Sequence, residues 1–321
     1  MQCPKCGAET KGRKNDPDAC GHCGKKLVET PRYFVPIVGI HFPLKEVTPF
    51  TVPIPFVPGL GWSRPTTKAV IFGDTHIGFH DEAALGIVNQ IIVEEKPDIL
   101  IHVGDLLDAG VISMKFPTDP SRLDTLQDDI DTARTKLHQW AQLAPQAERW
   151  LLEGNHEQRL TRLIWGLQGA ARELPKLRIF QQQMSWPVLL GLDQIGWNFV
   201  PYDDQPRADI LPRLLVKHGD VIRKYAGWTA KGEWEKSGKS GISGHTHRAA
   251  IWCHKDYNGT ARWIETGCTC KLEGTPGANS PDWQQAVTVI EWNEDKTLMD
   301  VRQTLIRDGR ALHNGEEIDG R

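Results

Sequence analysis

Five short clusters of residues that can bind metal ions follow one another along the chain. The clusters are Asp74-Thr75-His76, Gly104-Asp105, Gly154-Asn155-His156-Glu157, His218-Gly219 and Gly244-His245-Thr246-His247. Most of these clusters contain a glycine, which permits a tight turn beside the candidate ligand. Together the clusters offer seven candidate metal ligands: Asp74, His76, Asp105, Asn155, His218, His245 and His247. This set is large enough for two divalent cations that share one bridging carboxylate, and Asp105 is the natural bridge.

A ligand set of this kind favours hydrolysis at phosphorus. Two metal ions about 4 Å apart can generate a hydroxide and stabilise both the attacking and the leaving oxygen of an in-line displacement. Mixed carboxylate, amide and imidazole ligands suit Mn²⁺, Fe or Zn²⁺ better than Ca²⁺. A single Asp or His at one of these positions would more often be a surface or capping residue. The number, type and placement of all seven predict a phosphoester hydrolase with two divalent cations, Mn²⁺ first among them.

Each ligand cluster stands at or just after the end of a predicted strand. Apolar strands over residues 69–72, 99–103 and 150–152 lead into the first three clusters. Between these strands, the apolar spacing predicts helices over residues 82–95 and 123–140. The second half of the chain is richer in short strands. Open α/β sheets place ligand sites outside the carboxyl ends of their strands, so the pattern predicts an α/β domain that gathers the clusters there.

Four cysteines near the N-terminus predict a second metal site. Cys3, Cys6, Cys20 and Cys23 have the spacing C-x₂-C-x₁₃-C-x₂-C, which is typical of a Cys₄ structural zinc site. The segment resembles a zinc ribbon. Residues 1–28 carry six Lys and Arg against three Asp and Glu, a mild excess that favours an anionic partner. Such a module can bind nucleic acid or protein, or stabilise a chain terminus.

Composition divides the chain into four regions. Residues 1–28 form the Cys-rich module, and residues 29–65 form a connector with eight prolines. Proline at this density forbids regular helix or central strand, and the apolar side chains between the prolines predict that the connector packs on the main domain. Residues 66–305 form the α/β domain. Residues 306–321 are predicted to be a polar tail.

The overall composition narrows the classes of protein. The 321 residues include 38 Lys and Arg against 41 Asp and Glu, a formal net charge of −3. This balance excludes nucleic-acid binding through bulk positive charge alone, although a local basic groove is allowed. No apolar run approaches the roughly 18 residues of a membrane span, and the N-terminus has no signal-peptide core. The odd count of 7 cysteines favours reduced thiols, so we expect a cytoplasmic protein without membrane association.

The order D-x-H, G-D, G-N-H-E, H-G, G-H-T-H between residues 68 and 292 resembles the calcineurin-like metallophosphoesterase superfamily. The resemblance implies a layered sheet sandwich flanked by helices. It also implies that the first metal is held by Asp74, His76, Asp105 and His247. By the same resemblance, the second metal is held by Asp105, Asn155, His218 and His245. His156 would face the substrate, where it stabilises the transition state or protonates the leaving oxygen.

Two further resemblances limit the expected class of substrate. The ending Gly-His-Thr-His is similar to the nuclease and phosphodiesterase branch, which includes DNA double-strand-break repair nucleases. A zinc ribbon joined to such a domain resembles compact phosphoesterases often encoded by phages, for which the location would be the host cytoplasm. We therefore expect a phosphodiesterase or nuclease acting on DNA. Two alternatives are a phosphomonoesterase acting on a nucleotide or phosphoprotein, and a zinc-ribbon binding scaffold with a vestigial metal site.

Two arginines close to the ligand clusters are candidate substrate contacts. Arg159 follows the G-N-H-E cluster, and Arg248 follows His247 directly. The guanidinium fork suits bidentate recognition of phosphate. A surface salt bridge is an equally good interpretation of each.

Overall fold

The computed structural model describes residues 12–13, 16–20, 66–115, 124–257, 259–273 and 282–321. The chain divides into two compact units, Met1–Gly61 and Trp62–Arg321. In the first unit, the described residues form the antiparallel strands β1 (Gly12–Arg13) and β2 (Asp16–Cys20). Cys20 ends β2, whereas Cys3, Cys6, Cys23 and the connector over residues 29–65 lie outside the described residues. The zinc ribbon and the packing of the connector therefore stay predictions.

The second unit is built on two sheets. The first is an eight-stranded sheet with the order β15-β14-β13-β12-β3-β4-β5-β6. Its strands are β3 (Thr66–Phe72), β4 (Ile99–His102), β5 (Glu148–Leu152), β6 (Asn198–Val200), β12 (Gln285–Asn293), β13 (Met299–Arg307), β14 (Arg310–His313) and β15 (Glu316–Asp319). Strands β3 to β6 run parallel to one another, and β12 to β15 continue the sheet from β3 as an antiparallel meander.

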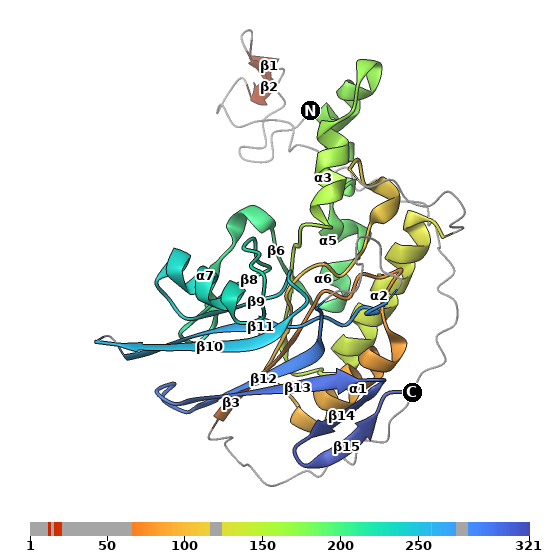
Figure 1. Cartoon of the computed structure of the whole chain (residues 1–321). Helices are drawn as coiled ribbons and strands as arrows, with labels where there is room; N and C mark the ends of the chain where they lie inside the picture. The colour runs from red at the N-terminus through yellow and green to blue at the C-terminus, as the bar shows by residue number, and fades with distance from the viewer. Residues whose placement is uncertain (1–11, 14–15, 21–65, 116–123, 258, 274–281) are drawn as a thin grey trace, which may run out of the picture. The chain divides into compact units, whose positions relative to one another are not determined.

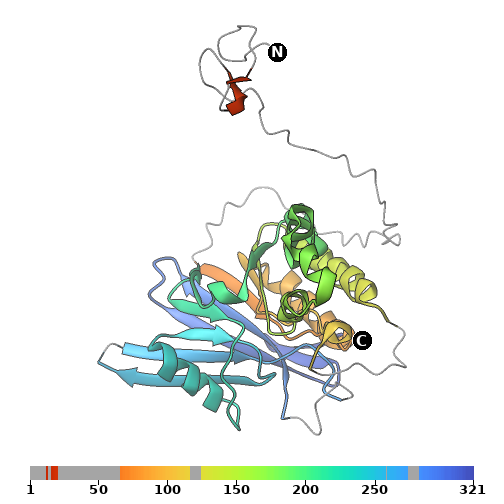
Figure 2. The same cartoon turned by 90° about the horizontal axis from the view of Figure 1, so that it is seen from above.

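The second sheet has five strands in the order β10-β11-β9-β8-β7. Its strands are β7 (Arg207–Leu211), β8 (Leu214–Lys217), β9 (Gly241–Ser243), β10 (Ala249–Asp256) and β11 (Gly259–Thr266). Helix α7 (Trp228–Ser237) covers this sheet on its outer face (Figures 1 and 2). Beneath the helix, a small apolar cluster forms from Leu215, Ala230 and Trp263.

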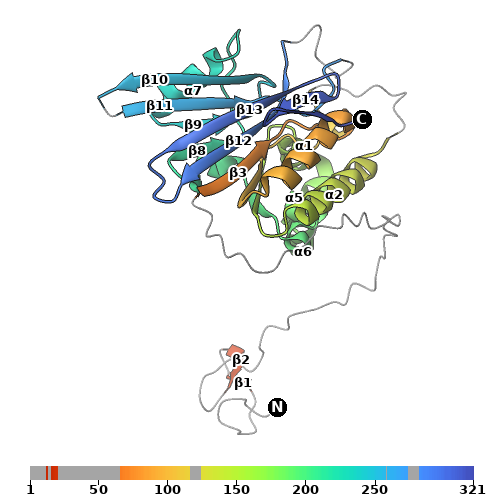
Figure 3. The same ribbon diagram turned by 90° about the horizontal axis from the view of Figure 1, so that it is seen from below.

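The remaining helices belong to the first sheet. They are α1 (Glu82–Glu95), α2 (Leu126–Leu143), α3 (Gln158–Trp165), α4 (Arg178–Gln183), α5 (Trp186–Leu189), α6 (Leu192–Ile195) and the 3₁₀ turns η1 (Gly110–Ile112), η2 (Gly169–Lys176) and η3 (Tyr202–Asp204). Helices α1 and α2 pack side by side (Figure 3). The predicted helix over 123–140 is α2, and it begins later because Thr125 caps it and forms a capping box with Asp128.

The alternation of side chains along β3 explains why its second half, Ala69–Phe72, is apolar at every position. Ala69 and Ile71 pack into the core between the two sheets, while Val70 and Phe72 pack into the core beneath the helices. Successive side chains of a strand point to opposite faces, so a strand covered on both faces must be apolar at every position. The result is a layered arrangement of helices, sheet, sheet and helix, which confirms the predicted α/β sandwich flanked by helices.

The prediction of a polar tail over residues 306–321 is wrong. This segment completes β13 and forms β14 and β15, which pair as antiparallel strands at the edge of the large sheet. Two-residue turns connect them: Asp308-Gly309 and Asn314-Gly315, all four residues with positive φ. Asp-Gly and Asn-Gly suit type I′ hairpin turns, which require positive φ at both central positions. The segment is polar because one face of an edge hairpin meets solvent, not because it is unstructured.

Candidate metal centre

The predicted ligands converge at the carboxyl ends of strands from both sheets. Asp74 follows β3, Asp105 follows β4 and Asn155 follows β5 in the large sheet. His218 follows β8 and His245 follows β9 in the small sheet. The centre therefore lies where the ends of the parallel strands of two packed sheets meet, as the strand-end pattern predicts.

The backbone at the centre adopts conformations that side chains other than glycine rarely take. Asp74, His76, Asp105, His245 and His247 have φ angles of 48°, 47°, 50°, 72° and 58°. Positive φ at such residues costs free energy, and it persists where the surroundings hold it for a functional purpose. Five strained residues, each a candidate ligand, mark one place in the fold.

Glycines beside the ligands are required by close approach as well as by turns. A Cβ atom on Gly154 would collide with the Asp105 carboxylate, and one on Gly244 would collide with the Asp74 carboxylate. Neither glycine has a positive φ. Their role is to let the loops after β5 and β9 pass directly against the acidic ligands.

The first group of ligands consists of Asp74, His76, Asp105 and His247. All four residues are buried, and one ligand atom of each lies within 4.8 Å of the others. The Nε2 atoms of His76 and His247 are 3.0 Å apart. His247 Nε2 is 3.3 Å from Asp74 Oδ1, and His76 Nε2 is 3.7 Å from Asp105 Oδ2. The four side chains thus point at a common position.

The second group shares Asp105 with the first. Ligand atoms of Asp105, His218 and His245 also lie within 4.8 Å of one another. His218 Nε2 is 3.3 Å from Asp105 Oδ2 and 3.0 Å from Asn155 Oδ1. All seven predicted ligands are therefore gathered in one centre, with Asp105 in both groups.

The electrostatics of the centre fit divalent cations. In the described part of the chain, Asp74 and Asp105 form ion pairs with histidines and with no Lys or Arg. Although burial opposes it, His218 and His156 hold the pKa of Asp105 well below its usual range, so this carboxylate is anionic. Against the same effect of burial, the carboxylates raise the pKa of His218 to about 9 and that of His247 to about 10. A divalent cation matches this negative potential, and the oxygen and imidazole donors suit Mn²⁺, Fe or Zn²⁺.

Glu157 is a supporting residue outside the set of predicted ligands. Its buried carboxylate accepts hydrogen bonds from the backbone N–H groups of Asp105 at 3.0 Å, Leu107 at 2.8 Å and Gly154 at 2.8 Å. It therefore ties the loop after β4 to the loop after β5. Burial and the neighbouring Asp105 raise the pKa of Glu157 to about 7. Its place in the G-N-H-E cluster is the one signal that could have revealed it.

Asp108 is a second supporting residue that the ligand patterns do not include. Its Oδ1 atom lies 3.4 Å from His76 Nδ1 and 3.3 Å from His156 Nδ1. Its backbone oxygen accepts hydrogen bonds from His156 Nδ1 at 2.9 Å and from Arg159 Nη1 at 2.5 Å. Partners of this kind fix the orientation of metal-binding and catalytic imidazoles.

His247 is held by two further side chains. Its Nδ1 atom is 3.9 Å from Cys270 Sγ, and its ring packs against the Trp283 ring with centroids 4.1 Å apart. Cys268 lies in the same buried group. The sulfur of Cys270 thus occupies the position where a carboxylate or carbonyl usually supports a metal-binding histidine.

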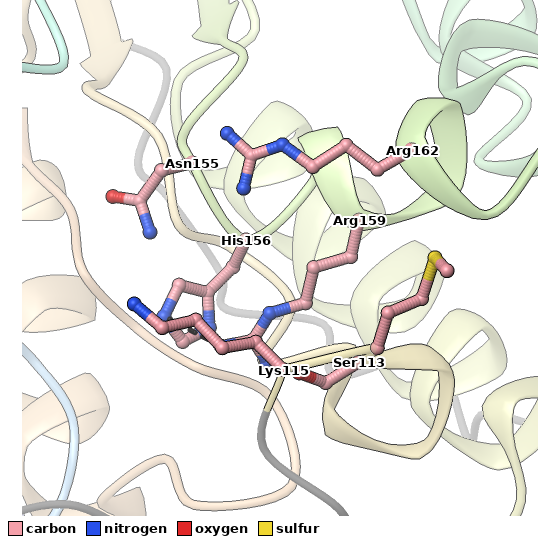
Figure 4. A pocket seen from close by; sticks show the side chains of 7 residues that line it. Ser113, Lys115, Asn155, His156, Arg159 and Arg162 are labelled. Atoms are coloured by element: carbon pink, nitrogen blue, oxygen red, sulfur yellow. Dashed lines mark hydrogen bonds between the residues drawn. The ribbon is translucent and has the colours of Figure 1, made fainter. Parts of the chain in front are cut away.

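The two candidate substrate arginines lie in different surroundings. Arg159 lines a pocket of about 240 Å³ together with Asn155 and His156 (Figure 4). Arg248 instead donates hydrogen bonds to the backbone oxygens of Asp282 and Arg223, at 3.2 and 2.6 Å. Its guanidinium is thus engaged by the chain itself, and it does not line that pocket. Arg159 thus shares this pocket with residues of the centre.

Fold and centre together define a metal-dependent phosphoester hydrolase. The model of the calcineurin-like phosphoesterases matches residues 67–249, and the chain belongs to this family. The matched segment carries all seven predicted ligands. Among the helices that the structure describes, none combines the length and the apolar character needed to cross a membrane.

Two curated relatives are phage proteins. The chain is 27% identical to the Gene 54 protein of Mycobacterium phage D29 over 201 residues, which are 58% of this chain and 71% of the relative. It is also 27% identical to the Gene 54 protein of Mycobacterium phage L5 over 243 residues, 70% of this chain and 88% of the relative. Among solved structures, Vacuolar Protein Sorting 29 from Cryptosporidium parvum has a TM-score of 0.42 and 10% identity over 79% of this chain and 98% of its own.

Proposed function

We propose that this chain is a dinuclear phosphodiesterase that cleaves DNA. The observation that carries the proposal is the shared carboxylate, because Asp105 belongs to two groups of converging ligands. Two divalent cations bound there would supply Lewis-acid activation of a water molecule and neutralise charge on the phosphoryl oxygens. Asp74, His76, Asp105 and His247 would hold one cation, and Asp105, Asn155, His218 and His245 the other. Mn²⁺ is the proposed metal.

His156 is the proposed acid for the leaving oxygen. Its Nδ1 atom is bound by the Asp108 carbonyl, which leaves Nε2 as the atom that exchanges a proton. That Nε2 atom lies 4.0 Å from Asp105 Oδ2 and thus beside the shared ligand. Burial opposes a rise in the pKa of His156, and so does Arg159, whose Nη2 atom lies 3.1 Å from Nε2. Asp105 and Asp108 nevertheless raise this pKa, which favours the protonated form that an acid requires.

DNA is the proposed substrate because three observations agree. The Gly-His-Thr-His ending resembles the nuclease and phosphodiesterase branch of the superfamily. The curated relatives come from phages. The pocket beside His156 is lined by Lys115, Arg159 and Arg162, and cations of this kind bind the phosphates of nucleic acids.

The proposal is tested by substrate comparison on the purified full chain with Mn²⁺. We expect turnover of bis(p-nitrophenyl) phosphate and cleavage of single- or double-stranded DNA, with two bound Mn²⁺ per chain by metal analysis. Diester turnover without DNA cleavage would contradict the nuclease assignment. Faster turnover of p-nitrophenyl phosphate than of the diester would replace it with a phosphomonoesterase.

For the N-terminal unit, we propose one structural Zn²⁺ on Cys3, Cys6, Cys20 and Cys23, and a nucleic-acid or protein partner for this unit. The support is the spacing of the four cysteines and the positive balance of residues 1–28. Metal analysis after exchange into Mn²⁺ should leave one zinc per chain. The variant Cys3→Ser/Cys6→Ser should lose this zinc and keep two Mn²⁺; loss of both kinds of metal would contradict separate sites.

A further inference from the structure

The pocket beside the candidate metal centre is built mainly from basic and neutral polar side chains. Ser113, Met114 and Lys115 line one part of it, and Asn155, His156, Arg159 and Arg162 line the rest (Figure 4). Its volume of about 240 Å³ is smaller than the range of about 300–1,000 Å³ typical of drug-sized ligands. A compact group such as a phosphate suits this size.

The charges of the pocket favour an anion. Three of its lining residues are Lys115, Arg159 and Arg162, and none is acidic. Arg159 and Arg162 are three residues apart on α3, so they lie on one face of the helix. Arg162 is exposed, and its Nη2 atom donates to the neutral side chain of Gln158 at 2.8 Å. Among the residues that the structure describes, no carboxylate pairs with Arg162, so its charge is available to a ligand.

The pocket continues directly from the metal centre. Asn155, a candidate ligand, and His156 belong to both. Arg159 Nη2 is 3.1 Å from His156 Nε2. His156 Nε2 is in turn 4.0 Å from the shared carboxylate of Asp105. Arg159 is itself paired with Asp108, with its Nη1 atom 3.7 Å from Oδ2, so Arg162 supplies the charge that a ligand can use. A group bound by Arg162 is therefore close to a phosphate bound at the centre.

We propose that this pocket is a second phosphate subsite, which binds the phosphate next to the one that is cleaved, with Arg162 as its main contact. The inference rests on the proposed function, because it assigns the first phosphate to the metal centre. The second phosphate has two chemical sources. In a polynucleotide it is separated from the first by a sugar, and in a nucleoside diphosphate it is joined to it directly. The proposal favours the polynucleotide, and the experiment below distinguishes the two.

Binding to the Mn²⁺-loaded full chain is measured by calorimetry at low temperature, with phosphate release followed to confirm that no turnover occurs. The three probes are thymidine 5′-monophosphate, thymidine 3′,5′-bisphosphate and thymidine 5′-diphosphate. For Arg162→Gln we expect the Kd of the 3′,5′-bisphosphate to rise about tenfold, since a charge-assisted contact to phosphate is lost. The Kd of the monophosphate should change less than about twofold.

Matched variants separate a specific contact from general charge. Arg178→Gln removes an exposed arginine from α4, outside the pocket, and should change none of the three Kd values. Arg162→Lys keeps the charge without the bidentate fork and should give an intermediate Kd for the bisphosphate. If Arg162→Gln raises only the Kd of the 5′-diphosphate, the result would support a second phosphate subsite that binds the second phosphate of a pyrophosphate.

Two results would overturn the subsite. One is an equal change, or no change, in all three Kd values for Arg162→Gln. The other is a wild-type chain that binds the bisphosphate no more tightly than the monophosphate. DNA cleavage is measured separately, so the two proposals can fail independently. If Arg162→Gln weakens binding of the bisphosphate selectively but the chain does not cleave DNA, the nuclease proposal fails and the subsite proposal stands. If the chain cleaves DNA but the variant shows no selective loss, the subsite proposal fails and the nuclease proposal stands.

Discussion

Two buried clusters of carboxylates and histidines in this domain have different chemistry. One is the candidate metal centre around Asp105. The other surrounds Glu95, at the end of α1, which contacts Lys68 on β3, Arg302 on β13 and His313 on β14. The Glu95 carboxylate lies 2.7 Å from Lys68 Nζ, 3.1 Å from Arg302 Nη1 and 3.0 Å from His313 Nε2. Both clusters contain acids and a histidine close enough to hold a metal ion.

The difference lies in the source of the positive charge. Glu95 has a lysine and an arginine as fixed partners, so the chain itself neutralises it. Among the described residues, Asp74 and Asp105 form ion pairs with imidazoles only, and they lie on loops with positive φ. A cluster whose acids are neutralised by Lys and Arg stabilises the fold. A cluster whose acids lack Lys and Arg partners and lie on a strained backbone is suited to bind metal cations. The number of acids and histidines alone does not distinguish these two roles.

The largest expected effect comes from removing the shared carboxylate. Asp105→Asn should lose both metal ions, because both ligand groups contain this residue. Turnover of bis(p-nitrophenyl) phosphate should fall on the order of 10³-fold, as when a main source of transition-state stabilisation is deleted. Metal content by mass spectrometry and initial rates measure the two effects.

The matched control is Glu95→Gln, which removes an equally buried acid from the other cluster. It should keep two metal ions and a wild-type rate at temperatures where the variant is folded. If Glu95→Gln lost metal as Asp105→Asn does, the distinction between the clusters would be wrong. Full biological effect in the Asp105→Asn variant would instead favour a binding scaffold with a vestigial centre.

A smaller effect is expected when only one ligand group is damaged. His218→Ala removes a ligand proposed for the second cation alone, so it should leave about one metal ion per chain. Activity should fall on the order of 10²-fold, since a single stabilising contact to the reacting phosphate is lost. Asn155→Ala should act in the same direction. Unchanged metal content in both variants would contradict the assignment of the second group.

The candidate ligands could be predicted from sequence because each belongs to a short motif at a strand end. The motifs are local, and the parallel strands β3, β4 and β5 carry three of them to the same edge. Glu157 and Asp108 could not be predicted in their roles. Their partners are about fifty positions away, as in the contact of Glu157 with Asp105, so only the folded structure defines what they do.

At the C-terminal hairpin, the amino-acid composition was misleading. The polar composition of residues 306–321 outweighed the Asp308-Gly309 and Asn314-Gly315 signals, although these dipeptides are strong indicators of hairpins. For Arg248, a substrate contact and a surface salt bridge were equally good interpretations. Its guanidinium lies 3.6 Å from the Asp282 carboxylate and donates to the backbone oxygens of Asp282 and Arg223. Direction of a side chain cannot be inferred from adjacency along the chain.

The cluster around Glu95 should affect stability and its dependence on pH. Burial opposes the shift, but Lys68, Asn314 and Arg302 lower the pKa of Glu95 from 4.5 to about 2. This difference corresponds to at most about 3 kcal/mol of stability at neutral pH. Solvent screening at the partly exposed Lys68 and Arg302 lowers the expected loss in Glu95→Gln to roughly 1–2 kcal/mol. A lowered pKa in the folded state means that the contribution is present above pH 4.5 and is lost as the pH falls toward 2.

Chemical denaturation of both proteins across pH 2.5 to 7 checks this prediction. The free energies of unfolding should differ most at neutral pH and converge in acid, where the protonated Glu95 of the wild type resembles glutamine. A difference that stays constant with pH would show that Glu95 acts by packing and not by charge.

The smallest expected effect concerns Cys270, which contacts the candidate centre without belonging to the ligand set. Cys270→Ala removes the group 3.9 Å from His247 Nδ1, so the imidazole loses a partner that fixes its orientation. Loss of such a partner typically weakens metal binding about 10- to 100-fold, and we expect the lower end because a sulfur contact of this length is weak. Competition with a metal chelator measures the change in Mn²⁺ affinity.

Cys268→Ala is the matched control for this variant. Cys268 is equally buried and lies in the same group, but its Sγ atom faces the backbone oxygen of Gln284 at 3.6 Å. Both substitutions remove a buried sulfur, so they should lower the free energy of unfolding by similar amounts. Cys270 lies directly against His247, whereas Cys268 hydrogen-bonds to Cys270. Cys270→Ala should therefore weaken Mn²⁺ binding more than Cys268→Ala. Equal losses of Mn²⁺ affinity would mean that the two cysteines support the centre through packing.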